Sequence, residues 1–229
     1  ICRLGGKALD QEGYDMLGLI CGSEGLLGII TEVTVKILKK PQTVKAALIG
    51  FPTHEDGGNC VSEIIANGIV PAGMEIMDKA LIEATDNFSK AAYPRDVELL
   101  LIVELDGTVS EVDELINKVS EISKKNNSST IKISKNEKER LSFWIGRKAA
   151  FPACGAMAPD YYCMDGSIPR GKLAEALKEI NKLSKKYNLS VANCFHAGDG
   201  NLHPLIMFDG SKKGELRKTE EFGSEILKM

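Results

Sequence analysis

The stretch from residue 189 to residue 208, "LSVANCFHAGDGNLHPLIMF", decides how the last part of this chain folds. Two apolar runs, 189–195 and 203–208, flank a segment that is rich in Gly, Asp and Asn. These residues favour tight turns, so the pattern predicts two strands joined by a turn. If the strands pair as a hairpin, His196 and His203 lie on the same face of it.

Helical and strand patterns alternate from Val44 up to this stretch. Apolar runs predict strands at 44–51, 97–105 and 130–134. Helical spacing predicts helices at 55–67, 77–92, 110–126, 138–150, 170–187 and 213–228, with a loop at 151–160. Helices between non-adjacent strands favour an α+β fold, in which helices cover one face of an antiparallel sheet in a ferredoxin-like arrangement.

The first 40 residues follow another pattern. Residues 18–29 hold a short apolar run and a glycine-rich turn, and residues 30–37 alternate as strands do. Pro41 ends this unit, so we expect two domains, 1–43 and 44–229.

Composition narrows the classes of function. The chain has 29 basic and 32 acidic residues, and no Lys/Arg cluster suited to a nucleic-acid backbone. Its longest apolar runs, such as 99–103, are far shorter than the roughly 20 residues of a transmembrane helix. Six cysteines without a CxxC pair favour reduced thiols in a cytoplasmic protein.

The two ends of the chain suggest a piece of a longer protein. It begins with Ile1 and has no signal-peptide pattern, and its last predicted helix lacks a C-cap glycine. We therefore expect the chain to begin in mid-protein and to stop before the natural terminus.

The histidine turn allows two interpretations. Two imidazoles at this spacing provide two nitrogen ligands for a zinc- or iron-like divalent ion, although such sites normally need a third ligand. Asp199 is the nearest carboxylate, but it is equally suited to an Asx-turn. A hairpin with two incidental histidines therefore remains open.

The segment "GSEGLLG", residues 22–28, has three glycines in seven residues. Without a Cβ, such a backbone can approach an anion or a flat ring closely. It matches neither the P-loop nor the GxGxxG pattern, so both a structural turn and a cofactor contact remain open.

The segment "FWIGRKAAFP", residues 143–152, carries Arg147 one helical turn after Trp144, the only tryptophan. A guanidinium can bind a substrate carboxylate through two parallel hydrogen bonds. The alternative is a solvated arginine beside a core tryptophan. Tyr161 and Tyr162, further along, are expected in the core.

Taken together, three stretches resemble a known family. Residues 13–42, "GYDMLGLICGSEGLLGIITEVTVKILKKPQ", resemble the end of the FAD-binding domain of the vanillyl-alcohol oxidase / p-cresol methylhydroxylase superfamily. Residues 143–170 and 191–209 resemble the C-terminal domain of the FAD-linked oxidases, most closely the glycolate oxidase branch. In that family a flavin takes hydride from the hydroxyl-bearing carbon of a 2-hydroxy acid.

The resemblance implies roles for particular residues. His196 and His203 would hold a divalent metal (zinc, iron or manganese) that polarises the substrate hydroxyl, and Arg147 would pair with the substrate carboxylate. Contacts to FAD are implied for Gly22, Ser23, Glu24, Gly25, Gly28, Ile30 and Asn201.

The resemblance also implies that parts of the active site lie outside the chain. The family's pyrophosphate loop precedes the present first residue, and a Glu-His-Gly motif, with a further metal ligand and a catalytic histidine, follows Met229. We therefore expect the isolated fragment to be inactive. The segment "YYCMDG" lacks a lysine that binds carboxylate in some relatives, which leaves the choice of substrate open.

Three functions follow as hypotheses. The first is a fragment of a flavin-dependent 2-hydroxy-acid dehydrogenase acting on glycolate or D-lactate, with electrons passing to iron–sulfur or electron-transfer flavoprotein subunits. Such an enzyme is expected in the cytoplasm, or peripheral to the inner membrane through those subunits. The second is a non-catalytic α+β binding or assembly module, and the third, which no residue favours, is a zinc hydrolase.

Overall fold

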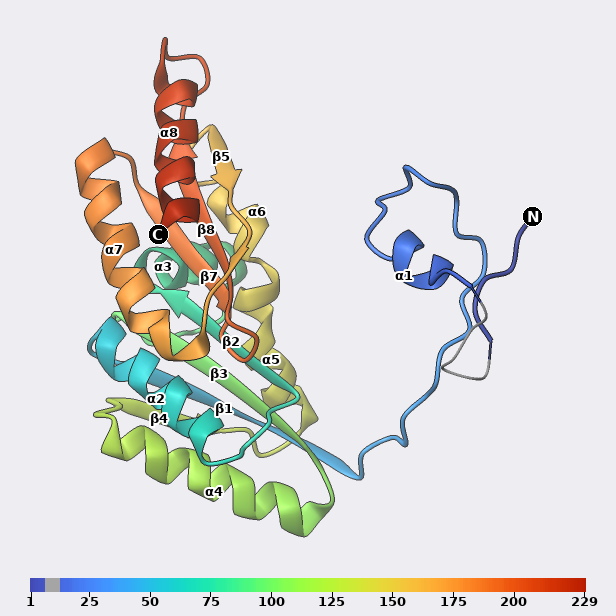
Figure 1. Ribbon diagram of the computed structural model, residues 1–229. Helices are drawn as coiled ribbons and strands as arrows, with labels where there is room; N and C mark the ends of the chain where they lie inside the picture. The colour runs from blue at the N-terminus through green and yellow to red at the C-terminus, as the bar shows by residue number, and fades with distance from the viewer. Residues whose placement is uncertain (7–12) are drawn as a thin grey trace. The chain divides into compact units, whose positions relative to one another are not determined.

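The computed structural model describes residues 1–6 and 13–229 and divides the chain into two compact units, 1–40 and 41–229 (Figure 1). The second unit carries the sheet and most of the helices. Its strands are β1 (Thr43–Phe51), β2 (Gly73–Asp78), β3 (Leu99–Gly107), β4 (Thr130–Ile133), β5 (Asp160–Cys163), β6 (Gly166–Ser167), β7 (Val191–His196) and β8 (Asn201–Phe208).

All the strands join one antiparallel sheet. The order across it is β4-β1-β3-β2-β7-β8-β5, and the short β6 also pairs with β8. The predicted strands at 44–51, 97–105 and 130–134 are confirmed as β1, β3 and β4, with ends shifted by at most two residues.

The helices of this unit are α2 (His54–Ala66), α3 (Lys79–Ser89), α4 (Val109–Lys125), α5 (Glu137–Lys148), α6 (Ala150–Cys154), α7 (Leu173–Tyr187) and α8 (Glu215–Lys228), with a 3₁₀ turn (Arg170–Lys172) before α7. Polar N-cap side chains fix where several of them begin. Thr53, Asp78, Thr108 and Asn136 each accept a hydrogen bond from a backbone N–H in the first turn of α2, α3, α4 and α5.

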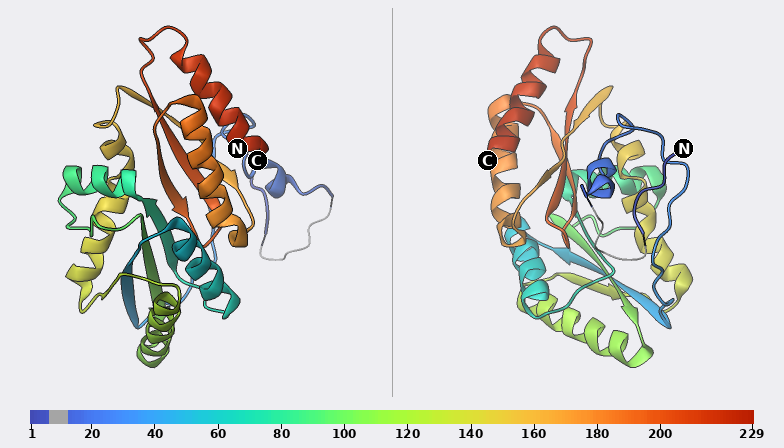
Figure 2. Two further views of the ribbon diagram at one scale, coloured as in Figure 1. Left: turned by 90° about the vertical axis from the view of Figure 1, so that its left-hand side faces the viewer. Right: turned by 45° about the vertical axis from the view of Figure 1, so that its right-hand side comes forward.

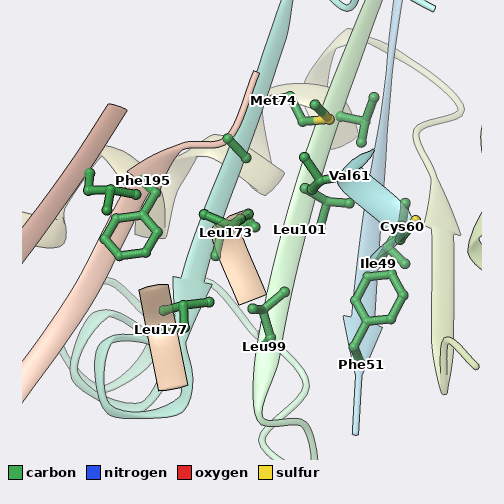
Figure 3. Close-up of a cluster of buried hydrophobic side chains, with 14 of the residues drawn as sticks. Ile49, Phe51, Cys60, Val61, Met74, Leu99, Leu101, Leu173, Leu177 and Phe195 are labelled. Carbon is green, nitrogen blue, oxygen red and sulfur yellow. The ribbon is translucent and has the colours of Figure 1, made fainter. Parts of the chain in front are cut away.

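Helices cover both faces of the sheet. Alternate residues of each strand point to opposite sides, so Ile49 and Leu101 enter one buried cluster, while Leu48 and Leu100 enter another. The larger cluster packs against α2, α4, α7 and α8, as Figure 3 shows in part for α2 and α7. The smaller cluster packs against α3, α5 and α6, and Figure 2 shows these helices on the opposite face of the sheet.

The antiparallel α+β architecture is thus confirmed, and the structure corrects the expectation of helices on one face only. The physical reason is visible in β3, where Leu99–Val103 is an unbroken apolar run and is buried throughout. A strand with two apolar sides needs a cover on both.

Two further boundaries differ from the sequence prediction. The helix predicted at 77–92 begins only at Lys79, because the preceding residues form β2, a strand that the sequence did not predict. The loop predicted at 151–160 starts within the short helix α6. In β2 a glutamate, Glu75, interrupts the apolar residues Met74 and Ile76 and obscured the strand.

The first unit, residues 1–40, has little regular structure among its described residues. Its one helix is α1 (Met16–Ile20), capped by Asp15. The strand expected at 30–37 is absent, because nothing in the described residues pairs with it, and Val33, Val35 and Ile37 are exposed. A strand without a neighbour lacks the hydrogen bonds that define it.

No helix of the described residues is long and apolar enough to cross a membrane.

Candidate active site

The hairpin predicted around the two histidines is confirmed. Strands β7 and β8 pair antiparallel, with His196 directly opposite Asn201. The turn closes when the backbone N–H of Gly200 donates to the carbonyl oxygen of His196 at 3.0 Å. Gly200 has a φ of +74°, and a Cβ there would lie 2.3 Å from the carbonyl oxygen of Ile168, so only glycine fits.

The imidazole rings of His196 and His203 meet on one face of this hairpin. Their centroids lie 5.1 Å apart and their planes are nearly perpendicular, at 88°. Cys194 and Leu205, two residues along each strand, belong to the smaller core cluster, so the histidines stand on the same face of the sheet as that cluster. The His196 side chain is 41% exposed and the His203 side chain 15%.

A carboxylate lies near the Nδ1 atom of each imidazole. Glu75, directly opposite His196 on β2, places Oε1 2.7 Å from His196 Nδ1. Asp165 Oδ1 lies 4.0 Å from His203 Nδ1, which is an ion-pair distance but too long for a hydrogen bond. Histidines that bind metals through one nitrogen commonly have a carboxylate at the other.

Arg147 of α5 is bound to the same glutamate. Its Nε and Nη2 atoms lie 3.0 and 2.9 Å from Glu75 Oε2. Both side chains are mostly covered, at 11% and 12% exposure. Glu75 occupies one edge of the guanidinium, while Nη1 has no hydrogen-bond partner among the described residues, so the contact of Arg147 with a substrate carboxylate stays a prediction.

Tyr93 fixes the end of α5 from which Arg147 projects. The Tyr93 hydroxyl donates to the carbonyl oxygen of Phe143 at 2.5 Å and accepts from the backbone N–H of Arg147 at 3.1 Å. It is thus inserted between two groups of one helical turn. Gly146 allows this, because a Cβ there would lie 2.3 Å from the Tyr93 ring. Burial raises the pKa of Tyr93 to about 12, so the hydroxyl keeps its proton.

A second partly buried carboxylate, Glu104 of β3, lies on the same face of the sheet. Its Oε2 atom accepts 2.6 Å hydrogen bonds from Arg140 Nη1 and Trp144 Nε1. Arg140 and Arg147 are two turns apart on α5, so this helix is fixed to neighbouring strands by two arginine–glutamate pairs. Trp144 therefore serves the packing of α5, and the pair at Glu104 has no contact with a histidine.

Asn201 lies beside the histidines. Its Oδ1 atom is buried and has no hydrogen-bond partner within the described part of the chain. Across the sheet, Glu75, His196 and Asn201 are successive register partners on β2, β7 and β8.

The glycine-rich turn belongs to the first unit. Gly22, Glu24 and Gly25 have positive φ values of 80°, 50° and 81°, and the backbone N–H of Leu26 donates to the carbonyl oxygen of Ser23. Ile30 is exposed. Gly22 and Gly25 are thus explained by the positive φ angles that the turn requires. Their contact with FAD remains a prediction, as does that of Gly28.

The cysteines near the site do not carry nucleophilic chemistry. Burial raises the pKa of both Cys154 and Cys194 to about 12, so both remain thiols at neutral pH. Tyr161 and Tyr162, expected in the core, are instead partly exposed on β5, at 36% and 37%, because that strand lies at the edge of the sheet.

Within residues 1–6 and 13–229, no three or more His, Cys, Asp or Glu side chains come together in a way that could hold a metal ion. A metal between the two histidines therefore stays a prediction, for which the distance between their rings can be compared with that of bound imidazoles. Each ligand nitrogen lies about 2 Å from a tetrahedral metal, so two bound imidazoles have ring centroids about 5 Å apart. The observed 5.1 Å fits two ligands of such a site.

Glu75 is the residue that sequence reasoning missed. It joins the predicted arginine to a predicted histidine, although the three come from β2, α5 and β7. The available signal was a charged residue between Met74 and Ile76, within a short apolar run. A buried carboxylate in such a run needs a partner.

The fold and these side chains define an α+β domain with a polar cluster at one end of a sheet face. Residues 40–229 match the family "FAD linked oxidases, C-terminal domain". The chain belongs to this family, which confirms the resemblance seen in the sequence.

Three curated relatives of known name match the chain over 91% or more of its length. The chain is 50% identical over 226 residues to glycolate oxidase subunit GlcD of Escherichia coli (strain K12), covering 99% of this chain and 45% of that protein. It is 35% identical over 228 residues to GlcD of Bacillus subtilis (strain 168), covering 99% and 48%. The mitochondrial D-lactate dehydrogenase (cytochrome) of Arabidopsis thaliana is 34% identical over 210 residues, covering 91% and 37%. The chain therefore spans about half the length, or less, of these relatives.

Solved structures share the fold. Alkyldihydroxyacetonephosphate synthase superposes with a TM-score of 0.67 at 16% identity, covering 95% of this chain and 45% of that one. Substrate-bound p-cresol methylhydroxylase gives 0.57 at 13% identity, covering 83% and 44%.

Proposed function

We propose that this chain is part of an FAD-dependent 2-hydroxy-acid dehydrogenase that oxidises glycolate or D-lactate to the 2-oxo acid. The single observation that carries the proposal is the convergence of His196, His203 and the Arg147–Glu75 pair on one sheet face, in a chain of the FAD-linked oxidase family. The names of the relatives, glycolate oxidase subunit and D-lactate dehydrogenase, supply the substrate class.

His196 and His203 would hold a divalent ion such as zinc, iron or manganese through one nitrogen each. The 5.1 Å separation of their rings and the carboxylates near their Nδ1 atoms support this assignment. When bound, such an ion lowers the pKa of a coordinated hydroxyl. The remaining ligand would come from residues beyond the described set.

Arg147 would bind the substrate carboxylate through Nη1, the edge of the guanidinium that Glu75 leaves unoccupied. Because Glu75 already neutralises much of its charge, Arg147 would orient the substrate more than attract it over a distance. A single charge-assisted hydrogen bond is still stronger than a neutral one.

FAD, when bound, accepts the hydride. Residues 1–43 would be the end of its binding domain, with contacts from Gly22, Ser23, Glu24, Gly25, Gly28 and Ile30, and residues 44–229 would be the substrate domain. The exposed apolar side chains of the first unit support this, because they suit a surface that further chain covers. Asn201 would face the flavin side with its unpartnered Oδ1.

Partner subunits would take the electrons from the flavin. This rests on the word subunit in the name of the GlcD relatives and on the cytochrome in the name of the plant relative. An iron–sulfur subunit and an electron-transfer flavoprotein are the two candidates. We place the enzyme in the cytoplasm or peripherally at the inner membrane through such subunits.

Dye reduction in the full-length protein that carries this chain tests the proposal. We expect a flavin spectrum and dye reduction with glycolate or D-lactate, and a large loss of both turnover and bound metal in His203→Ala. His54→Ala is the matched control, because His54 begins α2 and is the chain's only histidine outside the site. Colourless protein without 2-hydroxy-acid-dependent dye reduction would favour the alternative of a non-catalytic α+β module, and unchanged metal content in His203→Ala would remove the metal role.

A further inference from the structure

We propose that Glu75 is a positioning residue that fixes His196 and Arg147 together, one with each carboxylate oxygen. Oε1 holds His196 in the tautomer that carries its proton on Nδ1, and Oε2 holds the Nε–Nη2 edge of Arg147. The inference uses the proposed function only to place His196 and Arg147 in an active site.

The tautomer follows from the donors and acceptors around Glu75. Arg147 is always protonated, donates its Nε–H to Oε2 at 3.0 Å and places Nη2 2.9 Å from the same oxygen, so Glu75 is the carboxylate of an ion pair. An ionised carboxylate only accepts hydrogen bonds. The 2.7 Å contact with His196 therefore needs a proton on Nδ1, and a neutral ring then carries its free lone pair on Nε2.

The same contacts set the direction of Arg147. The Nε–H···Oε2 hydrogen bond and the 2.9 Å ion-pair distance from Nη2 to the same oxygen hold one edge of the guanidinium against Glu75. The pair is mostly covered, so solvent screens it less than an exposed pair. The β2–β7 register fixes Glu75 beside His196, and the contact of Glu75 with Arg147 of α5 then holds the guanidinium near the imidazole.

Glutamine at position 75 gives a distinct prediction. The side-chain amide has one oxygen and one NH₂ group. The NH₂ cannot face the N–H donors of Arg147, so the oxygen must turn toward Arg147 and the NH₂ toward His196. The NH₂ then donates to His196 Nδ1, and the histidine proton moves to Nε2.

Glu104→Gln is the matched control. Glu104 is also a buried strand glutamate bound by an α5 arginine, at 18% exposure against 12% for Glu75, and it has no contact with a histidine. The control therefore reproduces the loss of one buried ion pair on the same sheet face. An effect seen in Glu75→Gln but not in Glu104→Gln must therefore come from the lost contacts of Glu75 with His196 or Arg147.

NMR of the ¹⁵N-histidine-labelled 229-residue chain tests the inference, at about pH 8, where free imidazole is neutral. The chain has only three histidines, which can be assigned by substitution. We expect the Nδ1–H tautomer for His196 in the wild type and in Glu104→Gln, and the Nε2–H tautomer in Glu75→Gln. A wild-type His196 with its proton on Nε2, or a tautomer that survives in Glu75→Gln, overturns the inference.

The wild-type spectrum alone decides the tautomer even if Glu75→Gln fails to fold. In the full-length protein, Glu75→Gln is expected to lower metal affinity 10- to 100-fold relative to Glu104→Gln, and equal affinities count against the positioning role. A full-length protein without flavin activity would remove the proposed function and leave the tautomer result intact.

Discussion

Gly146→Ala is expected to destabilise the fold, although alanine is the better helix former. Gly146 lies inside α5, where alanine gains up to about 1 kcal/mol in helix propensity. The new Cβ, however, would lie 2.3 Å from Cε2 and 2.8 Å from the hydroxyl of Tyr93. Tyr93 is 4% exposed and cannot swing into solvent without leaving the core.

The magnitude follows from what Tyr93 loses. Overpacking a core site costs about 1–3 kcal/mol. Moving the ring also breaks the hydrogen bonds of its hydroxyl to Phe143 and Arg147, at about 0.5–1.5 kcal/mol each. Set against the gain in propensity, the net loss is about 3 kcal/mol in the free energy of unfolding.

Urea unfolding followed by the fluorescence of Trp144, the only tryptophan and a neighbour on α5, measures this loss. Gly171→Ala is the control, because a Cβ there meets nothing within 4 Å. We expect a clear fall in the urea midpoint for Gly146→Ala and a change of a few tenths of a kcal/mol for Gly171→Ala. Equal stability of the two variants would refute the close packing of Tyr93 against α5.

Three further outcomes are expected. Burial raises the pKa of the Asp78 carboxyl above its ordinary 3.8, so the stability that this group contributes is full below pH 3.8 and is lost as pH rises through the folded pKa. In urea unfolding from about pH 4 to pH 8, the free energy of unfolding of Asp78→Asn should therefore rise relative to that of the wild type as pH rises, and a difference that stays constant with pH would contradict the shift. Trp144→Phe removes a donor to the Glu104 carboxylate and should cost about 1.5–3 kcal/mol by circular dichroism in urea, whereas an unchanged midpoint would make that bond irrelevant. Thiol titration of the native chain should find three reactive cysteines, the exposed Cys2, Cys21 and Cys163, and three that react only after unfolding, the buried Cys60, Cys154 and Cys194. Fast reaction of a buried cysteine in the native chain would contradict the packing.

Local patterns predicted most of the fold. The alternation of helices and strands and the Gly-Asp-Asn turn before His203 act within a few residues, and the structure confirms what they predicted. The second helical layer was missed because an apolar run such as Leu99–Val103 shows that a strand is buried without showing what covers each side. The segment at 30–37 was wrongly predicted as a strand. Alternation of apolar and polar residues leads to a strand only where a neighbouring strand can pair with it, and residues 30–37 have none among the described residues.

The candidate site was predicted less completely. His196 and His203 are close in sequence, so their meeting followed from one hairpin. Arg147 and Glu75 are 72 residues apart and meet only through tertiary packing, in which α5 lies against α3 and β1. Sequence spacing carries no information on such a contact, so the ion pair between Arg147 and Glu75 could not be predicted.

The central claim is that this chain helps a flavin oxidise a small 2-hydroxy acid. The most direct measurement is the flavin absorbance of the full-length protein, mixed anaerobically with glycolate or D-lactate, because this needs no further protein and no electron acceptor. We predict that one of these acids bleaches the flavin and that His196→Ala slows the bleaching at least 100-fold. A bound flavin that neither acid reduces, or bleaching at the wild-type rate in His196→Ala, would contradict the claim.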